Sequence, residues 1–170
     1  MKLIVWLLAM GAFGLFTRSG WSDSIPVTVS ASDVSVKVSG EWSDIEMAGW
    51  PLGIEPARPI LPRRTLIYAL PPDADLASVR VVMGKTTSSI QPVAQPVRPG
   101  AAMRPTNGDK VISYGAAKSV VKGLDTGIYG QDAYFPAAHA RLVGTSNMRD
   151  WTLAHVEVDP VLYHPARSHL

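Results

Sequence analysis

The sequence predicts an all-β protein, an antiparallel β-sandwich of short strands, and three observations support this prediction. The 170 residues include 14 prolines and 14 glycines spread along the chain. No window of about a dozen residues free of both shows the i, i+3, i+4, i+7 apolar spacing of an amphipathic helix. Short runs rich in β-branched residues recur instead, separated by turn-forming residues. Such runs are typical of a sandwich or a partly open barrel.

The first 22 residues have the pattern of a secretory signal peptide. Lys2 supplies a positive charge, and residues 3–16 form an apolar run without charge. This run is shorter than the roughly 18 apolar residues that a membrane-spanning helix needs. Gly20 and Ser22 stand at the −3 and −1 positions of a cut after Ser22. We therefore expect residues 1–22 to be cleaved, with an uncleaved anchor as the alternative, and residues 23–170 to form a domain that is periplasmic or extracellular.

Six strands are predicted from apolar runs, and turns punctuate them. In chain order these strands are 25–29, 34–38, 66–70, 79–82, 118–122 and 152–158. In residues 34–38 valines alternate with polar residues, which predicts one buried face. Residues 66–70 are almost continuously apolar, as expected of a strand covered on both faces. Residues 92–109, rich in proline, glycine and alanine, are expected to form a long connection.

Charge and composition exclude several classes of function. Removal of residues 1–22 takes away Lys2 and Arg18, which leaves 14 basic residues against 14 acidic ones. A net charge near zero disfavours binding to nucleic acid, and no stable membrane span is expected. The chain contains no cysteine. It therefore has no thiol nucleophile and no thiolate ligand for zinc, and we expect no cofactor.

Two local patterns require a weighing of alternatives. Residues 125–127 read Asp-Thr-Gly, the tripeptide that carries the catalytic carboxylate of aspartic peptidases. A single copy would require a homodimer, and aspartate and glycine also simply form turns. The histidines lack the His-x-x-x-His spacing of a helical metal site, so no metal is expected. They are His139, His155, His164 and His169.

Several proline-containing segments occur in an order that resembles a known family. They are 57–62 (Ala-Arg-Pro-Ile-Leu-Pro), 69–72 (Ala-Leu-Pro-Pro), 90–96 (Ile-Gln-Pro-Val-Ala-Gln-Pro), 129–136 (Tyr-Gly-Gln-Asp-Ala-Tyr-Phe-Pro) and 158–165 (Val-Asp-Pro-Val-Leu-Tyr-His-Pro). Over about residues 50–170 they resemble the N-terminal pro-region of gingipain-type cysteine peptidases. Ala57 stands where that family usually has glycine. The last two segments match the blocks Tyr-x-x-Asp-x-x-x-Pro and Pro-Val-x-Tyr-x-Pro and are the most specific.

The resemblance implies structural rather than catalytic roles for the motif residues. It also implies that a basic residue blocks the cleft of the peptidase. The structural residues are Pro59, Leu61, Pro62, Tyr129, Asp132, Pro136, Pro160, Tyr163 and Pro165. Apart from the resemblance, the tyrosines are expected to bury their rings while their hydroxyls bind backbone. Gingipain-like clefts favour a basic residue, so a loop that blocks such a cleft should present lysine or arginine. The candidates are Lys118 and Lys122, followed by Arg104 and Lys110.

The resemblance implies a non-enzymatic, secreted pro-region that masks, or assists the folding of, a gingipain-like cysteine endopeptidase. Members of that family continue into one or two further strands and a peptidase domain with a His/Cys dyad. This chain ends at Leu170, so we expect a truncated or split precursor, with the peptidase as a partner in cis or in trans. The alternatives are a secreted binding or adhesion module on the same scaffold, and, remotely, a dimeric aspartic peptidase that uses Asp125.

Overall fold

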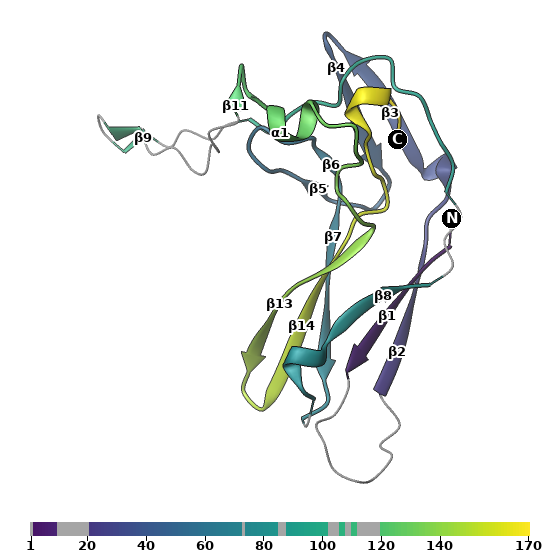
Figure 1. Ribbon diagram of the computed structural model, residues 1–170, viewed down its shortest axis with the longest axis vertical. Helices are drawn as coiled ribbons and strands as arrows, with labels where there is room; N and C mark the ends of the chain where they lie inside the picture. Colours follow the sequence, from purple (N-terminus) through teal and green to yellow (C-terminus); the bar gives the residue numbers. More distant parts are fainter. Residues whose placement is uncertain are drawn as a thin grey trace. The chain divides into compact units, whose positions relative to one another are not determined.

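The computed structural model describes residues 2–9, 21–72, 74–84, 88–101, 106–107, 110–111 and 120–170 (Figure 1). Strands dominate these residues, and every pair of neighbouring strands is antiparallel. The all-β class predicted from the sequence is therefore confirmed. The chain forms two compact units, each assembled from three separate stretches of sequence. The predicted extent of the exported domain, residues 23–170, stays a prediction.

The first unit comprises Met1–Ala31, Arg64–Ser89 and Ala140–Pro160 and contains two three-stranded sheets. The strands of the first sheet, in spatial order, are β2 (Trp21–Thr28), β1 (Lys2–Ala9) and β8 (Arg80–Met83). Those of the second are β13 (Ala140–Met148), β14 (Trp151–Val158) and β7 (Arg64–Leu70). Strands β8 and β13 contact each other, so the two sheets of this unit meet along them. β1 lies within the predicted signal peptide, whose removal stays a prediction.

Strand β14 shows the side-chain alternation that its sequence predicts. Ala154, Val156 and Val158 are fully buried, whereas the intervening residues are partly exposed. The prediction that residues 66–70 are covered on both faces is wrong, because Ile67 is 58% exposed and only Leu70 of this run is buried. β7 is an edge strand with β14 on one side, and alternate side chains of an edge strand point away from the covered face.

The second unit comprises Ser32–Arg63, Ile90–His139 and Val161–Leu170 and consists of strand pairs and one short helix in its described residues. The paired strands are β3 (Val34–Ser39) with β4 (Trp42–Met47), β5 (Leu52–Gly53) with β6 (Leu61–Pro62), β9 (Thr106–Asn107) with β10 (Lys110–Val111), and β11 (Val120–Val121) with β12 (Leu124–Asp125). The helix is α1 (Thr126–Tyr129). The chain also contains 3-10 helices: η3 (Pro165–Arg167) in this unit, η2 (Leu76–Ser78) in the first unit, and η1 (Ala31–Asp33) at the boundary between the two in sequence.

The connection after Ile90 contributes to the core of the second unit. Two of its valines, Val93 and Val97, are buried, and Val97 bridges Ser43 of β4 in parallel orientation. The buried core cluster consists of Ile45, Leu61, Val93, Val97, Val161 and Tyr163. Residues 92–101 of the predicted connection contain isolated bridges but no strand, whereas residues 106–107, its other described part, form β9. The burial of Val93 and Val97 in the core thus holds the irregular backbone of residues 92–101 in place.

A close approach of two backbones fixes the segment that follows β5. Gly100 N donates to Arg58 O and Gly100 O accepts from Ala57 N, both at 2.8 Å. A Cβ atom on Gly100 would lie 2.1 Å from the carbonyl oxygen of Glu55, so only glycine fits here. Ala57 itself has φ +63° and is 1% exposed. This left-handed backbone explains why glycine is the expected residue at position 57 of the motif.

Within the described parts of the chain, no helix reaches the length and apolar character that crossing a membrane would require.

Candidate functional site

The two most specific sequence blocks pair with each other. Phe135 N donates to Tyr163 O, and Tyr163 N donates to Phe135 O, both at 2.7 Å, which forms an antiparallel bridge. The ring of Tyr163 also meets that of Tyr129 edge to face, with 6.4 Å between the centroids. Tyr163 is 1% exposed and belongs to the core cluster. The two blocks therefore meet within the second unit, whereas the structural roles that the resemblance assigns to the other motif residues stay a prediction.

Tyr129 is fixed by its hydroxyl as well as by its ring. Its Oη donates to the carbonyl oxygen of Val97 at 2.7 Å, as expected of a buried tyrosine that binds backbone. Burial, together with the neighbouring Tyr163, raises the pKa of Tyr129 well above its ordinary value. Burial also raises the pKa of Tyr163. Both phenols therefore remain neutral far above physiological pH.

The first motif block is buried, and an ion-pair network flanks it. Pro59, Leu61 and Pro62 are all buried. Next to them, Glu55 accepts hydrogen bonds from the guanidinium groups of Arg58, at 2.6 Å, and Arg63. Burial acts to raise the pKa of Glu55, but the hydrogen bonds from Arg63 and Arg58 outweigh it and lower the pKa below the ordinary value. The carboxylate is thus held charged as an anchor for the segment.

Asp125 has a structural role in this arrangement. Its Oδ1 accepts from Gly127 N at 3.0 Å, so the carboxylate caps α1. Its Oδ2 lies 3.7 Å from Arg58 Nε, and Asp125 N donates to Ala57 O at 2.9 Å. An aspartic peptidase needs a carboxylate that shares a proton with a second one. The contact of Asp125 Oδ1 with the amide of Gly127 is the geometry of a capped turn, and Arg58 lies on the other side of the carboxylate.

A cluster of rings lies at the C-terminal end, around Tyr134. The rings of His164 and His169 lie 4.8 and 5.6 Å from that of Tyr134, and Tyr134 Oη is 2.8 Å from His169 Nε2. Asp132 Oδ1 lies 3.4 Å from His164 Nε2 and 3.3 Å from Arg167 Nε. Asp132 therefore ties the first of the two late blocks to η3. Among the described residues, no three metal-ligating side chains are grouped to hold an ion.

The candidate basic residues are only partly within the described structure. Lys122 is exposed and forms, with Gly123, the two-residue loop between β11 and β12. Both loop residues have positive φ, +50° and +81°, as a type I′ hairpin turn requires. Lys110 begins β10, where it pairs with Asn107. Lys118 and Arg104 lie outside the described residues.

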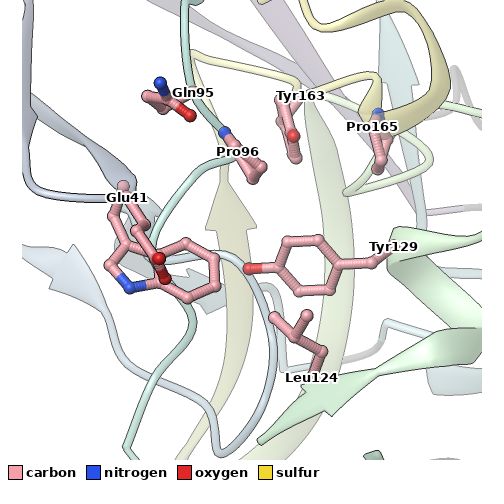
Figure 2. A pocket seen from close by; sticks show the side chains of 8 residues that line it. Glu41, Gln95, Pro96, Leu124, Tyr129, Tyr163 and Pro165 are labelled. Carbon is pink, nitrogen blue, oxygen red and sulfur yellow. The ribbon is translucent and has the colours of Figure 1, made fainter. Parts of the chain in front are cut away.

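An open pocket of about 510 Å³ lies in the second unit (Figure 2). Its lining comes from five separate stretches of chain. These residues are Glu41, Trp42, Gln95, Pro96, Leu124, Tyr129, Tyr163 and Pro165. Figure 2 shows the Tyr129 ring reaching into the pocket, with Leu124 on one side and Pro96 on the other. Aromatic rings and prolines thus form most of the surface, and Glu41 carries its only charge.

Sequence reasoning found Tyr129, Tyr163 and Pro165 as motif residues but missed the pocket that they line. Glu41 and Trp42 are also absent from every motif that the sequence offered. Glu41 belongs to the two-residue loop between β3 and β4, where Gly40 takes φ +65°. The one feature of the sequence that could have indicated this part of the pocket is Trp42, an aromatic residue directly after a hairpin turn that contains glycine. Nothing local in the sequence connects it to Tyr129, because the pocket depends on tertiary contacts.

A family model matches most of the chain, and two solved structures resemble it at low sequence identity. The family model described as Propeptide_C25 matches residues 45–170. A solved complex of the pro- and mature domains of Porphyromonas gingivalis RgpB is similar over 80% of this chain and 66% of that chain, with 17% identity and a TM-score of 0.50. A structure described as an insight into the zymogenic latency of gingipain K from the same organism has 14% identity, 80% and 72% coverage and a TM-score of 0.47. No curated protein matches. The chain thus spans just under two thirds of the RgpB chain, and that likeness concerns the fold.

Proposed function

The chain belongs to the Propeptide_C25 family, and from this premise we propose that it is a non-catalytic pro-region that masks a gingipain-like cysteine endopeptidase or assists its folding. The observation that carries the proposal is the family match over residues 45–170, which includes both late motif blocks. The likeness of the fold to the RgpB complex supports it. The chain contains no cysteine, so it does not supply the nucleophile of such a peptidase.

We assign the blocking role to the hairpin loop at Lys122, on the strength of its geometry. The two-residue turn fixes the backbone on both sides of Lys122, and its side chain is exposed. A cation presented on a short, rigid loop loses little conformational entropy when it enters a cleft. The neighbouring candidate Lys118 precedes β11 closely in sequence and remains the alternative. Arg104 and Lys110 lie earlier in the chain and rank below both.

Inhibition of a gingipain-like peptidase tests the proposal. Residues 23–170, added in excess to the active enzyme, should abolish hydrolysis of a peptide substrate with arginine or lysine before the cut. The Lys122→Ala variant should raise the inhibition constant roughly 30-fold, because truncation of one member of a buried charge pair costs about 2 kcal/mol or more. Unchanged peptidase activity in the presence of excess wild-type chain would refute masking.

Arg149→Ala provides a matched control for the Lys122 variant. Arg149 is also an exposed basic residue with positive φ, +56°, in a two-residue loop, between β13 and β14. The proposal expects this variant to inhibit as well as the wild type does. A loss of inhibition in Arg149→Ala but not in Lys122→Ala would place the blocking residue in the other hairpin.

We further propose that residues 1–22 direct export and are removed, so that the domain acts in the periplasm or outside the cell. The sequence pattern described above supports this. Mass spectrometry of the protein recovered from a secreting host should show a chain that begins at Asp23. Recovery of the intact Met1 chain from the membrane fraction would instead support the uncleaved anchor.

A further inference from the structure

We propose that the pocket of the second unit binds the side chain of an arginine in an extended peptide segment. Leu124 of the hairpin assigned to peptidase masking contributes to the lining, but Lys122 of its loop does not. The occupant of the pocket is therefore a second interaction of the chain, and it does not depend on the proposed function. Three features of the pocket support the assignment: its aromatic walls, the sign of its charge and its preformed shape.

The walls of the pocket suit a flat cation. Trp42 and Tyr129 are partly exposed aromatic lining residues, and Pro96 and Pro165 contribute apolar surfaces, whereas Tyr163 also lines the pocket but is only 1% exposed. The faces of indole and phenol rings attract cations through their quadrupole, and arginine uses this contact more often than lysine does. A guanidinium group is also planar and weakly hydrated, so it stacks on such rings at a low desolvation cost.

The charge of the pocket favours a cation and disfavours an anion. Glu41 is the only ionisable lining residue that is charged at neutral pH, because both tyrosines stay neutral. Lys37, on the hairpin that carries Glu41, pairs with Glu46 at 2.6 Å, and Arg98, from the connection after Ile90, pairs with Asp44 of that hairpin. In the described part of the chain, no ion pair involves Glu41. A carboxylate beside aromatic faces can accept two hydrogen bonds from one guanidinium.

The pocket does not need to rearrange to accept this ligand. The hydrogen bond from Tyr129 to Val97 O fixes the ring, since Val97 is fully buried. The edge-to-face contact with Tyr163 holds it from a second side. Gln95 is anchored through its backbone, because its carbonyl oxygen accepts from the hydroxyl of the buried Ser43 at 2.8 Å. Such preorganisation reduces the entropy lost on binding.

Prolines at the rim favour a peptide over a free amino acid. Pro96 is exposed and Pro165 is partly exposed, and neither has an N–H group to satisfy. Proline-rich peptides in an extended conformation dock in grooves that are lined by aromatic residues, and this pocket has such residues in its lining. The open form of the pocket leaves room for the backbone on both sides of the arginine.

Calorimetric titration of the purified chain with acetyl-Ala-Pro-Arg-Pro-Ala-amide tests the proposal. The same peptide with citrulline, which is neutral and nearly isosteric, should bind roughly tenfold more weakly, because it lacks the charge-assisted hydrogen bonds. The lysine peptide should bind several-fold more weakly, because it lacks the planar group. Free arginine amide should also bind more weakly than the peptide, because it lacks the contacts of the backbone with the rim.

Variants locate the binding at the pocket. Glu41→Gln removes the charge at an exposed position and should weaken binding of the arginine peptide about tenfold. Asp150→Asn is the matched control, since Asp150 is likewise an exposed acid in a two-residue hairpin loop, and it should leave binding unchanged. In nuclear magnetic resonance spectra, the indole N–H signal of Trp42 should shift on titration and that of Trp151 should not.

The proposal is wrong if the citrulline peptide binds as tightly as the arginine peptide, or if no heat and no shift of the Trp42 signal appear at millimolar peptide. Equal binding of the lysine peptide would overturn the assignment to arginine, and equal binding of free arginine amide would overturn the assignment to a peptide. None of these measurements involves a peptidase. Failure here would therefore leave the masking proposal unaffected, and failure of masking would leave this one unaffected.

Discussion

Replacement of Gly100 by alanine probes the backbone contact that joins the first motif block to the connection after Ile90. The new Cβ would lie 2.1 Å from Glu55 O and 2.9 Å from Glu55 C. Carbon and oxygen atoms that are not bonded usually stay above about 3.3 Å, so the two backbones must separate by roughly 1 Å. Both obstructing atoms belong to the backbone, and no side chain can rotate away to make room.

This separation would break the two backbone hydrogen bonds of Gly100 and lower the stability of the fold. The hydrogen bonds of Gly100 to Ala57 and Arg58, both 2.8 Å now, would lengthen beyond useful range. Each contributes about 1 kcal/mol, and overpacking of a buried site costs a further 1–3 kcal/mol. We expect Gly100→Ala to lower the free energy of unfolding by about 3–5 kcal/mol. For a chain of this length that is a fall in the melting temperature of roughly 6–20 °C.

Urea and thermal unfolding, followed by circular dichroism, measure this change. Gly144→Ala serves as the control because a Cβ there would meet no atom within 4 Å. It should alter the free energy of unfolding by less than about 1 kcal/mol. If Gly100→Ala unfolded at the same urea concentration as this control, the close approach of the two backbones would be refuted.

Three further outcomes follow from the buried polar groups. Tyr129→Phe should cost about 1 kcal/mol in urea unfolding, because Val97 O loses its donor, and an unchanged midpoint would contradict that hydrogen bond. The pKa of Glu55 is lowered in the fold, as is that of Asp44 through its hydrogen bond from Arg98. The ion pairs of Glu55 and Asp44 therefore stabilise the fold fully above about pH 4, and this stabilisation is lost as the pH falls below that value. Glu55→Gln should reduce the loss of unfolding free energy between about pH 4 and lower pH. An unchanged dependence on pH in this range would contradict the lowered pKa of Glu55. The raised pKa values of Tyr129 and Tyr163 give stabilisation that is present below about pH 10 and lost as pH rises above it. Absorbance at alkaline pH should show both phenols ionising only on unfolding, and ionisation of all five tyrosines near pH 10 in the folded chain would contradict it.

Local patterns in the sequence were sufficient to locate the strands in which apolar and polar side chains alternate. Residues 34–38 and 152–158 fall within β3 and β14, and the buried face of β14 is the predicted one. The buried face predicted for residues 34–38 is wrong, because Val34 and Val36 are only partly buried and Val38 is 58% exposed. Strand β13 escaped prediction, because a bulge after Leu142 and the glycine at position 144 interrupt its period. β7 was predicted as a strand but with the wrong environment, since its place at a sheet edge depends on topology.

The sequence by itself determined the all-β class, the absence of a thiol nucleophile and the order of the motif blocks. Each of these depends on composition or on short-range pattern, which the chain carries without folding. Only the tertiary structure decided that Phe135 pairs with Tyr163, that Tyr129 reaches Val97, and that five separate stretches line one pocket. Such contacts join residues 28 to 32 positions apart or more, and a long loop can close in many ways at a similar cost in entropy. The packing of the core selects among them, and that packing is a property of the folded chain.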